Sequence, residues 1–121
     1  MRLLFLIALT SLLTSCASVK PQPEAFTSAE QAIAAAVRAG AEQHSPVELR
    51  FAREKLAEAR KGMEYKQFDK ALYLIEHSEI NSELAIEKSR TAEVRARLGE
   101  QARENEILRE DFERTFGESF E

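Results

Sequence analysis

Residues 45–72, SPVELRFAREKLAEARKGMEYKQFDKAL, decide the fold because they contain a helix with a marked start, a turn and the beginning of another helix. Ser45 is the expected N-cap, Pro46 suits the first helical position, and Glu48 completes a capping box three residues after the serine. The stretch therefore predicts a helical hairpin with its turn at residues 65–68. Its first helix has an apolar stripe with spacings of three and four residues: Leu49, Ala52, Leu56, Ala59 and Met63.

The helix after this turn is expected to begin at Phe68 and to continue to about Phe116, because no proline occurs there and helix-forming residues predominate. Unbroken, it would be a rod about 70 Å long. The residues expected to close the hairpin are Tyr65, Phe68, Ala71, Leu72 and Ile75.

Farther along this helix, small side chains that allow helices to approach closely form a seam. We expect the two earlier helices to pack along it, and the far end of the seam could instead accept a second chain. Its members are Ser78, Ser82, Ala85, Ser89, Ala92 and Ala96, with bulk added by Leu84 and Ile86.

A further helix is expected before the hairpin, starting at Thr27 or Ser28 and ending near Gly40. Its alanine-rich face, Ala29, Ile33, Ala36 and Val37, is that of an ordinary core helix. The predicted fold class is all-α. It is a three-helix hairpin or bundle over residues 26–98, with the last helix continuing as an extended charged helix and tail over residues 99–121.

The N-terminal segment has the three parts of an export signal: a positive start at Met1-Arg2, a short apolar core, and the small residues Thr14 and Ser15. The apolar run is well short of the ~20 residues that a spanning helix needs. Residues 13–16, Leu-Thr-Ser-Cys, resemble the bacterial lipobox. That resemblance implies removal of residues 1–15 and attachment of diacylglycerol and palmitate-type acyl chains to Cys16. The alternative is an export signal followed by a free thiol.

Residues 16–25 are then expected to be the lipidated N-terminus and a flexible tether. Pro21 and Pro23 favour an extended chain that does not pack against the folded part. Two or more acyl chains would hold such a protein stably at a bilayer. The predicted role of the tether is spacing.

Composition limits the classes of function. The chain has 17 basic and 21 acidic residues. Loss of Arg2 with the signal would leave 16 basic residues, so the formal net charge of the mature chain would be 16 − 21 = −5. This mild acidity argues against nucleic acid as a partner. A single cysteine allows no disulfide within the chain.

A row of large apolar residues near the C-terminus is the best candidate for a partner-binding surface. Leu108, Phe112, Phe116 and Phe120 are four residues apart and should lie on one helical face among charged residues. Self-association and binding of a foreign partner are both open, with self-association slightly favoured. The apolar spacing lacks sustained bulky heptads, which argues against a parallel trimer.

No pattern in the chain predicts chemistry. There is no zinc-binding His-Glu-x-x-His sequence, glycine-rich phosphate loop or nucleophile elbow, so we expect neither an enzyme nor a cofactor. His77 with Asn81, next to Glu79 and Glu83, could form a surface metal site, but solvated charge is favoured there.

A resemblance to a known family covers Ala32 to Ala92, and its main carriers are Ala39-Gly40-Ala41, Ser45-Pro46-Val47-Glu48-Leu49, Lys55-Leu56, Tyr65-Lys66, Phe68 and Glu83-Leu84-Ala85. In these residues the chain resembles a family of bacterial proteins defined by domain of unknown function 4398. Its members are typically lipoproteins of the Gram-negative envelope, and some carry a peptidoglycan-binding domain of the outer-membrane protein A type after a long helix. No such domain is visible here, and the resemblance implies location and helical shape but no site residues.

These observations together predict a helical protein that is lipid-anchored at the outer membrane, faces the periplasm and has a structural or adaptor role. Ala17, directly after the cysteine, is compatible with sorting to the outer membrane. The alternative function is a carrier or binding module for a small ligand or peptide in the hairpin bundle.

Overall fold

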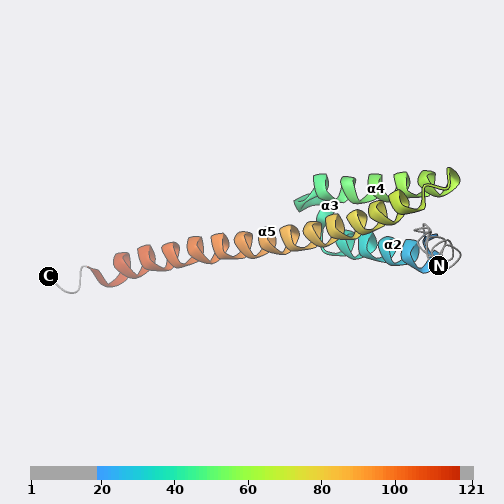
Figure 1. Ribbon diagram of the computed structural model, residues 1–121. Helices are drawn as coiled ribbons and strands as arrows, with labels where there is room; N and C mark the ends of the chain where they lie inside the picture. Colours follow the sequence, from blue (N-terminus) through green and yellow to red (C-terminus); the bar gives the residue numbers. More distant parts are fainter. Residues whose placement is uncertain (1–18, 118–121) are drawn as a thin grey trace, which may run out of the picture.

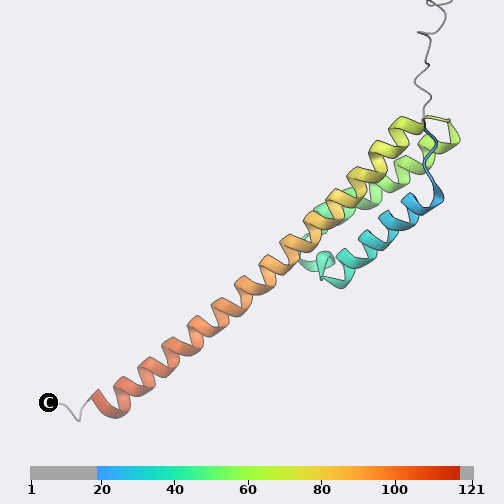
Figure 2. The ribbon, with the colours of Figure 1, turned by 60° about the horizontal axis from the view of Figure 1, so that its bottom comes forward.

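The computed structural model describes residues 19–117, which form helices and contain no strand. In chain order these are α2 (Pro23–Arg38), α3 (Ala41–His44), α4 (Pro46–Glu64) and α5 (Phe68–Phe116). Helices α2 and α4 run along the first half of α5, and the second half of α5 projects from this bundle as a single helix (Figures 1 and 2). The predicted all-α bundle with a long extended C-terminal helix is confirmed.

Helix α5 is continuous over 49 residues, a length of about 74 Å. No proline interrupts it, and Gly99 is its single glycine. The α-helical hydrogen bonds therefore continue past the end of the bundle. The start of α2 and the free end of α5 lie at opposite ends of the described molecule (Figures 1 and 2).

The core is narrow because many of its side chains are small. One cluster joins α2, α4 and the start of α5, and a second joins α2, α3, α4 and the middle of α5. Small side chains let the helix backbones approach closely, so the bundle is stabilised by contact between backbones as well as by apolar burial. The buried members are Ala29, Leu56, Ala59, Leu74 and Ile75 in the first cluster, and Ala36, Ala41, Leu49 and Ala85 in the second.

Two residues expected to close the hairpin do not do so. Tyr65 caps the end of α4 and is 74% exposed, and Leu72 is 47% exposed on the outer side of α5. Leu74 is buried instead. The α5 face that meets α4 contains Ala71, Leu74 and Ser78, and Leu72 is about 100° away from Ala71 around the helix.

The seam of small residues is confirmed as far as Ser89. The Ser78 hydroxyl donates to the carbonyl of Ala52 in α4 at 2.8 Å, a direct bond between the two helices. The Ser82 hydroxyl donates to the Ser78 carbonyl at 2.8 Å, within α5. Beyond Ser89, Ala92 is half-buried and Ala96 is exposed, because neither α2 nor α4 extends alongside this part of α5.

The first helix starts earlier than expected. Pro23 is at its first position, and the Thr27 hydroxyl donates to the Pro23 carbonyl at 3.3 Å instead of capping the helix. Pro21 is buried. The expected tether to residue 25 was therefore wrong in its last part, because a proline at the first position favours helix and Phe26 packs on the core.

The connection between α2 and α4 contains a short helix. Gly40 has φ 79°, in the left-handed region, and its chain reversal is followed directly by α3, a single helical turn. A side chain at this position would be strained. Gly40 therefore acts as the expected stop, while residues 41–44 form a helical turn whose Ala41 is buried.

Candidate interaction surface

The projecting half of α5 begins where α4 begins, and two serine side chains and one backbone carbonyl are bonded together at that point. The Ser45 and Ser89 hydroxyl oxygens are 2.8 Å apart, and each is 2.7 Å from the Ala85 carbonyl oxygen. Because each hydroxyl has one hydrogen, one of them donates to the carbonyl and the other donates to its neighbour's oxygen. All three groups are buried and satisfied within this triangle.

The expected capping box was wrong in its contacts. Ser45 occupies the N-cap position of α4, but its hydroxyl makes no capping bond because it is turned toward α5. Glu48 forms an ion pair with Lys88 of α5. The Glu48 side chain is 14% exposed, and the hydrogen bond from Lys88, with a smaller contribution from its own backbone N–H, lowers the pKa of its carboxyl. The two residues that looked like a local cap thus connect α4 to the base of the projecting helix.

Beyond Ala92 every described residue is exposed except the half-buried Gly99. This part of α5, residues 93–117, is here called the stalk. It has no other element beside it (Figures 1 and 2). Ion pairs one turn apart stabilise it as a single helix by a few tenths of a kcal/mol each. They are Glu93–Arg97, Glu106–Arg109 and Asp111–Arg114.

The structure places three of the four predicted partner-binding residues on this stalk. Leu108 is 65% exposed, Phe112 62% and Phe116 48%, and the rings of Phe112 and Phe116 lie 5.0 Å apart with a 40° tilt. Phe120 lies outside the described residues. The three residues together form an apolar patch on a charged helix, the kind of surface that binds other proteins.

Further exposed apolar residues were missed by the sequence reasoning. Val94 and Leu98 lie on the stalk, and Tyr73 and Ile80 lie on the part of α5 within the bundle. Leu84 was expected to add bulk to the packed seam, but it is 44% exposed on the opposite side of α5. The spacing of these residues from Leu108 would have shown that they share its face.

The residues considered for metal binding have other contacts. The His77 ring lies 4.1 Å from the Tyr73 ring, and the Asn81 amide donates to the His77 carbonyl at 2.6 Å. Residues 19–117 contain no group of three or more His, Cys, Asp or Glu side chains placed to hold a metal ion.

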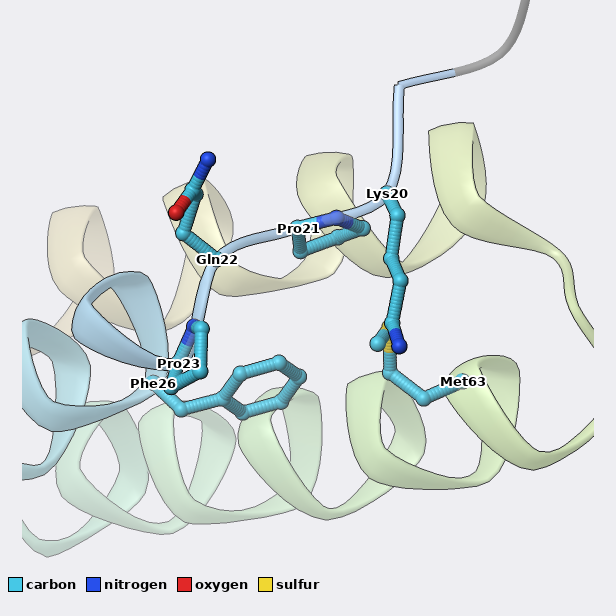
Figure 3. A pocket seen from close by; sticks show the side chains of 6 residues that line it. All are labelled: Lys20, Pro21, Gln22, Pro23, Phe26 and Met63. Atoms are coloured by element: carbon cyan, nitrogen blue, oxygen red, sulfur yellow. The ribbon is translucent and has the colours of Figure 1, made fainter.

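An open hollow of about 590 Å³ lies where the N-terminal segment meets the bundle. Pro21 and Phe26 form one wall and Met63 of α4 another, with Lys20 close to Met63 (Figure 3). The hollow is at the end of the bundle opposite the stalk (Figures 1 and 3). Cys16, the predicted lipid attachment residue, lies outside the described part of the chain. In the described part, no helix combines the length and the apolar character needed to cross a membrane.

Comparison with known proteins gives one match. No curated protein and no solved structure is significantly similar to the chain. The family described as a domain of unknown function (DUF4398) matches residues 24–102, which include the three long helices up to the first part of the stalk. Because this match spans well over half of the sequence, the chain belongs to the DUF4398 family.

Proposed function

We propose that this protein is a lipid-anchored component of the bacterial cell envelope with a structural or adaptor role, held at the outer membrane on its periplasmic face. The lipobox-like residues Leu13-Thr14-Ser15-Cys16 support the anchor. The anchor holds one end of the molecule. The other end is free to bind.

The observation that carries this proposal is the position of the apolar patch. Leu108, Phe112 and Phe116 lie near the free end of α5, while the chain enters the bundle at its opposite end (Figure 1). A helix the length of α5 separates the two by about 70 Å. An anchored chain of this shape presents a binding surface well away from its own membrane.

The anchor is tested by Cys16→Ser. The variant is expected to fold but to appear in the soluble periplasmic fraction, whereas the wild type fractionates with the outer membrane. If the variant remains in the membrane fraction, the lipid on Cys16 is not what holds the protein there.

The binding role of the patch is tested by deleting residues 108–121. Because the described part of this range, residues 108–117, lies on the stalk away from the bundle, the remaining chain should keep its helical circular dichroism per residue while association is lost. Light scattering provides the measurement. Equal mass with and without the deleted residues contradicts a role in self-association, and unchanged capture of envelope proteins by cross-linking contradicts an adaptor role.

The alternative function, a carrier of a small ligand or peptide, would use the hollow beside Phe26 and Met63. This hollow is open and lies on the outside of the helices, so it excludes little water from a ligand. The adaptor role is preferred because the exposed patch on the stalk needs no conformational change to bind.

A further inference from the structure

Most of the exposed large apolar residues of α5 lie on one continuous face. Starting at position 80, spacings of four and three residues alternate through positions 84, 87, 91, 94, 98, 101, 105, 108 and 112, here called the heptad face. Six of its ten positions are large apolar residues that are 44% to 65% exposed: Ile80, Leu84, Val94, Leu98, Leu108 and Phe112. Leu108 and Phe112 of the patch at the end of the stalk are the last two positions of this face, and Phe116 lies beside it.

This face points away from the bundle. At 3.6 residues per turn it is centred about 180° from the buried residues of α5, such as Ser78, Ala85 and Ser89. Helices α2 and α4 therefore cover one side of α5 and leave the heptad face open along its whole length. A repeat of seven residues is the pattern by which two helices wind around each other in a left-handed coiled coil.

We propose that the heptad face pairs with the same face of a second copy of this chain, in parallel and in register. The inference deepens the proposed function, since it names the partner of the apolar patch. Parallel pairing also follows if both chains are anchored through Cys16 in one membrane.

The polar positions of the face favour a second copy as the partner. In register, Gln101 meets Gln101 and Asn105 meets Asn105, while Val94, Leu98, Leu108 and Phe112 meet their own copies. A carboxamide has both donor and acceptor groups, so two identical side chains satisfy each other. A single buried asparagine in such a seam fixes register and a two-stranded state. Glu87 and Thr91 interrupt the apolar pattern, so the tightest pairing is expected on the stalk, from Val94 to Phe112.

Charges beside the face agree with parallel pairing. In a parallel pair Glu104 lies next to Arg109 of the second copy, and Glu83 lies next to its Lys88, each contact occurring twice by symmetry. One like-charge contact is formed, between Arg90 and Arg95, and Arg90 already donates to Glu87 of its own chain at 2.7 Å. Arg109 is bound to Glu106 at 2.6 Å in an exposed pair, and such pairs are weak enough to exchange.

The competing antiparallel arrangement centred on Arg103 also matches apolar with apolar layers, since Leu98 would meet Leu108 and Val94 would meet Phe112. It would place Arg95 next to Arg109 of the second copy and Glu104 next to its own copy. The parallel arrangement avoids both of these like-charge contacts.

Two adjacent residues provide a matched test. Leu98→Glu and Leu108→Glu alter the heptad face, whereas Ile107→Glu alters an equally exposed apolar residue about 100° away from Leu108. In a full-length Cys16→Ser chain, sedimentation should show a two-fold lower mass for the first two variants and no change for the third. A wild-type chain that stays monomeric, or an equal effect of all three variants, overturns the proposal.

Orientation is tested with single cysteines placed in the same Cys16→Ser chain. Leu98→Cys should cross-link to its own copy on mild oxidation, because the two Cα atoms fall within disulfide range in a parallel pair. In the antiparallel pair they would be about 15 Å apart along the axis. Ile107→Cys is the control that should not cross-link. If cross-linking occurs at 107, or fails at 98, parallel pairing is wrong.

These variants separate the two proposals. Leu98→Glu leaves Cys16 and the residues from Leu108 onward in place. A monomeric Leu98→Glu variant of the otherwise intact chain that still fractionates with the membrane supports both proposals. If the wild type is anchored but monomeric, the proposed adaptor role is still supported, and the proposal that a second copy is the partner is wrong.

Discussion

The hydroxyl oxygens of Ser45 and Ser89 lie 2.8 Å apart although 44 residues separate them in the sequence. Both are within 2.7 Å of the Ala85 carbonyl, so the start of α4 is bonded to α5 at the point where the stalk begins. Ser45 is the residue of this group that crosses between helices. Its bonds join the first residues of α4 to α5 at the end of the bundle from which the stalk projects.

Replacing Ser45 with alanine should therefore destabilise the protein. It removes a buried hydrogen bond between helices, worth about 1 kcal/mol. Ser82→Ala is the matched control, because that equally buried hydroxyl bonds only to Ser78 in its own helix and its loss should cost less. Denaturant unfolding measures both variants. Equal losses of unfolding free energy would show that the hydrogen bond between helices contributes no more to stability than the one within α5.

Alanine substitution at two glycines should have opposite effects. Gly40 has φ 79°, and an alanine there is expected to cost about 1 kcal/mol of unfolding free energy. Gly99 lies in the stalk, where an added Cβ comes no closer than 4.0 Å to Arg103, so Gly99→Ala should stabilise the helix by up to ~1 kcal/mol. Thermal unfolding followed by circular dichroism checks the signs. A stabilising Gly40→Ala would contradict the left-handed turn between α2 and α3.

Stability should fall at acid pH through Glu48. The folded state lowers the pKa of this carboxyl below its ordinary value of 4.5, chiefly through the hydrogen bond from Lys88. A lowered folded-state pKa means that the contribution is complete above about pH 4.5 and is lost as the pH falls through the folded-state pKa. Chemical denaturation of wild type and Glu48→Gln from pH 3 to pH 7 is the measurement. The stability difference between them should shrink below pH 4.5, and a constant difference would rule out the pair as its source.

The long helices were predictable because their signals are local. Pro46 starts α4 and Phe68 starts α5 at the positions that the sequence predicts, and the absence of proline explains the uninterrupted α5. Serines 78, 82 and 89 were placed in the packed seam by spacing alone.

The remaining features depend on how the helices are rotated against each other. Burial of Leu74 in place of Leu72 follows from the face that α5 turns toward α4, which no local pattern fixes. The spacing of Ser45 and Glu48 in the sequence fits a capping box. In the folded chain, however, both side chains bond to residues of α5, which a local pattern cannot show. Spacing alone can show that the residues of the heptad face are aligned, but the packing of α2 and α4 on the opposite side of α5 is needed to show that the face is open.

The central claim is that the chain is fixed to a membrane at one end and binds at the other. The most direct test is mass spectrometry of the N-terminal peptide from protein extracted from the outer-membrane fraction. The account predicts a mature chain that begins at Cys16 and carries a diacylglyceryl thioether with added acyl mass. A chain that retains residues 1–15, or that begins elsewhere with an unmodified thiol at Cys16, would contradict it.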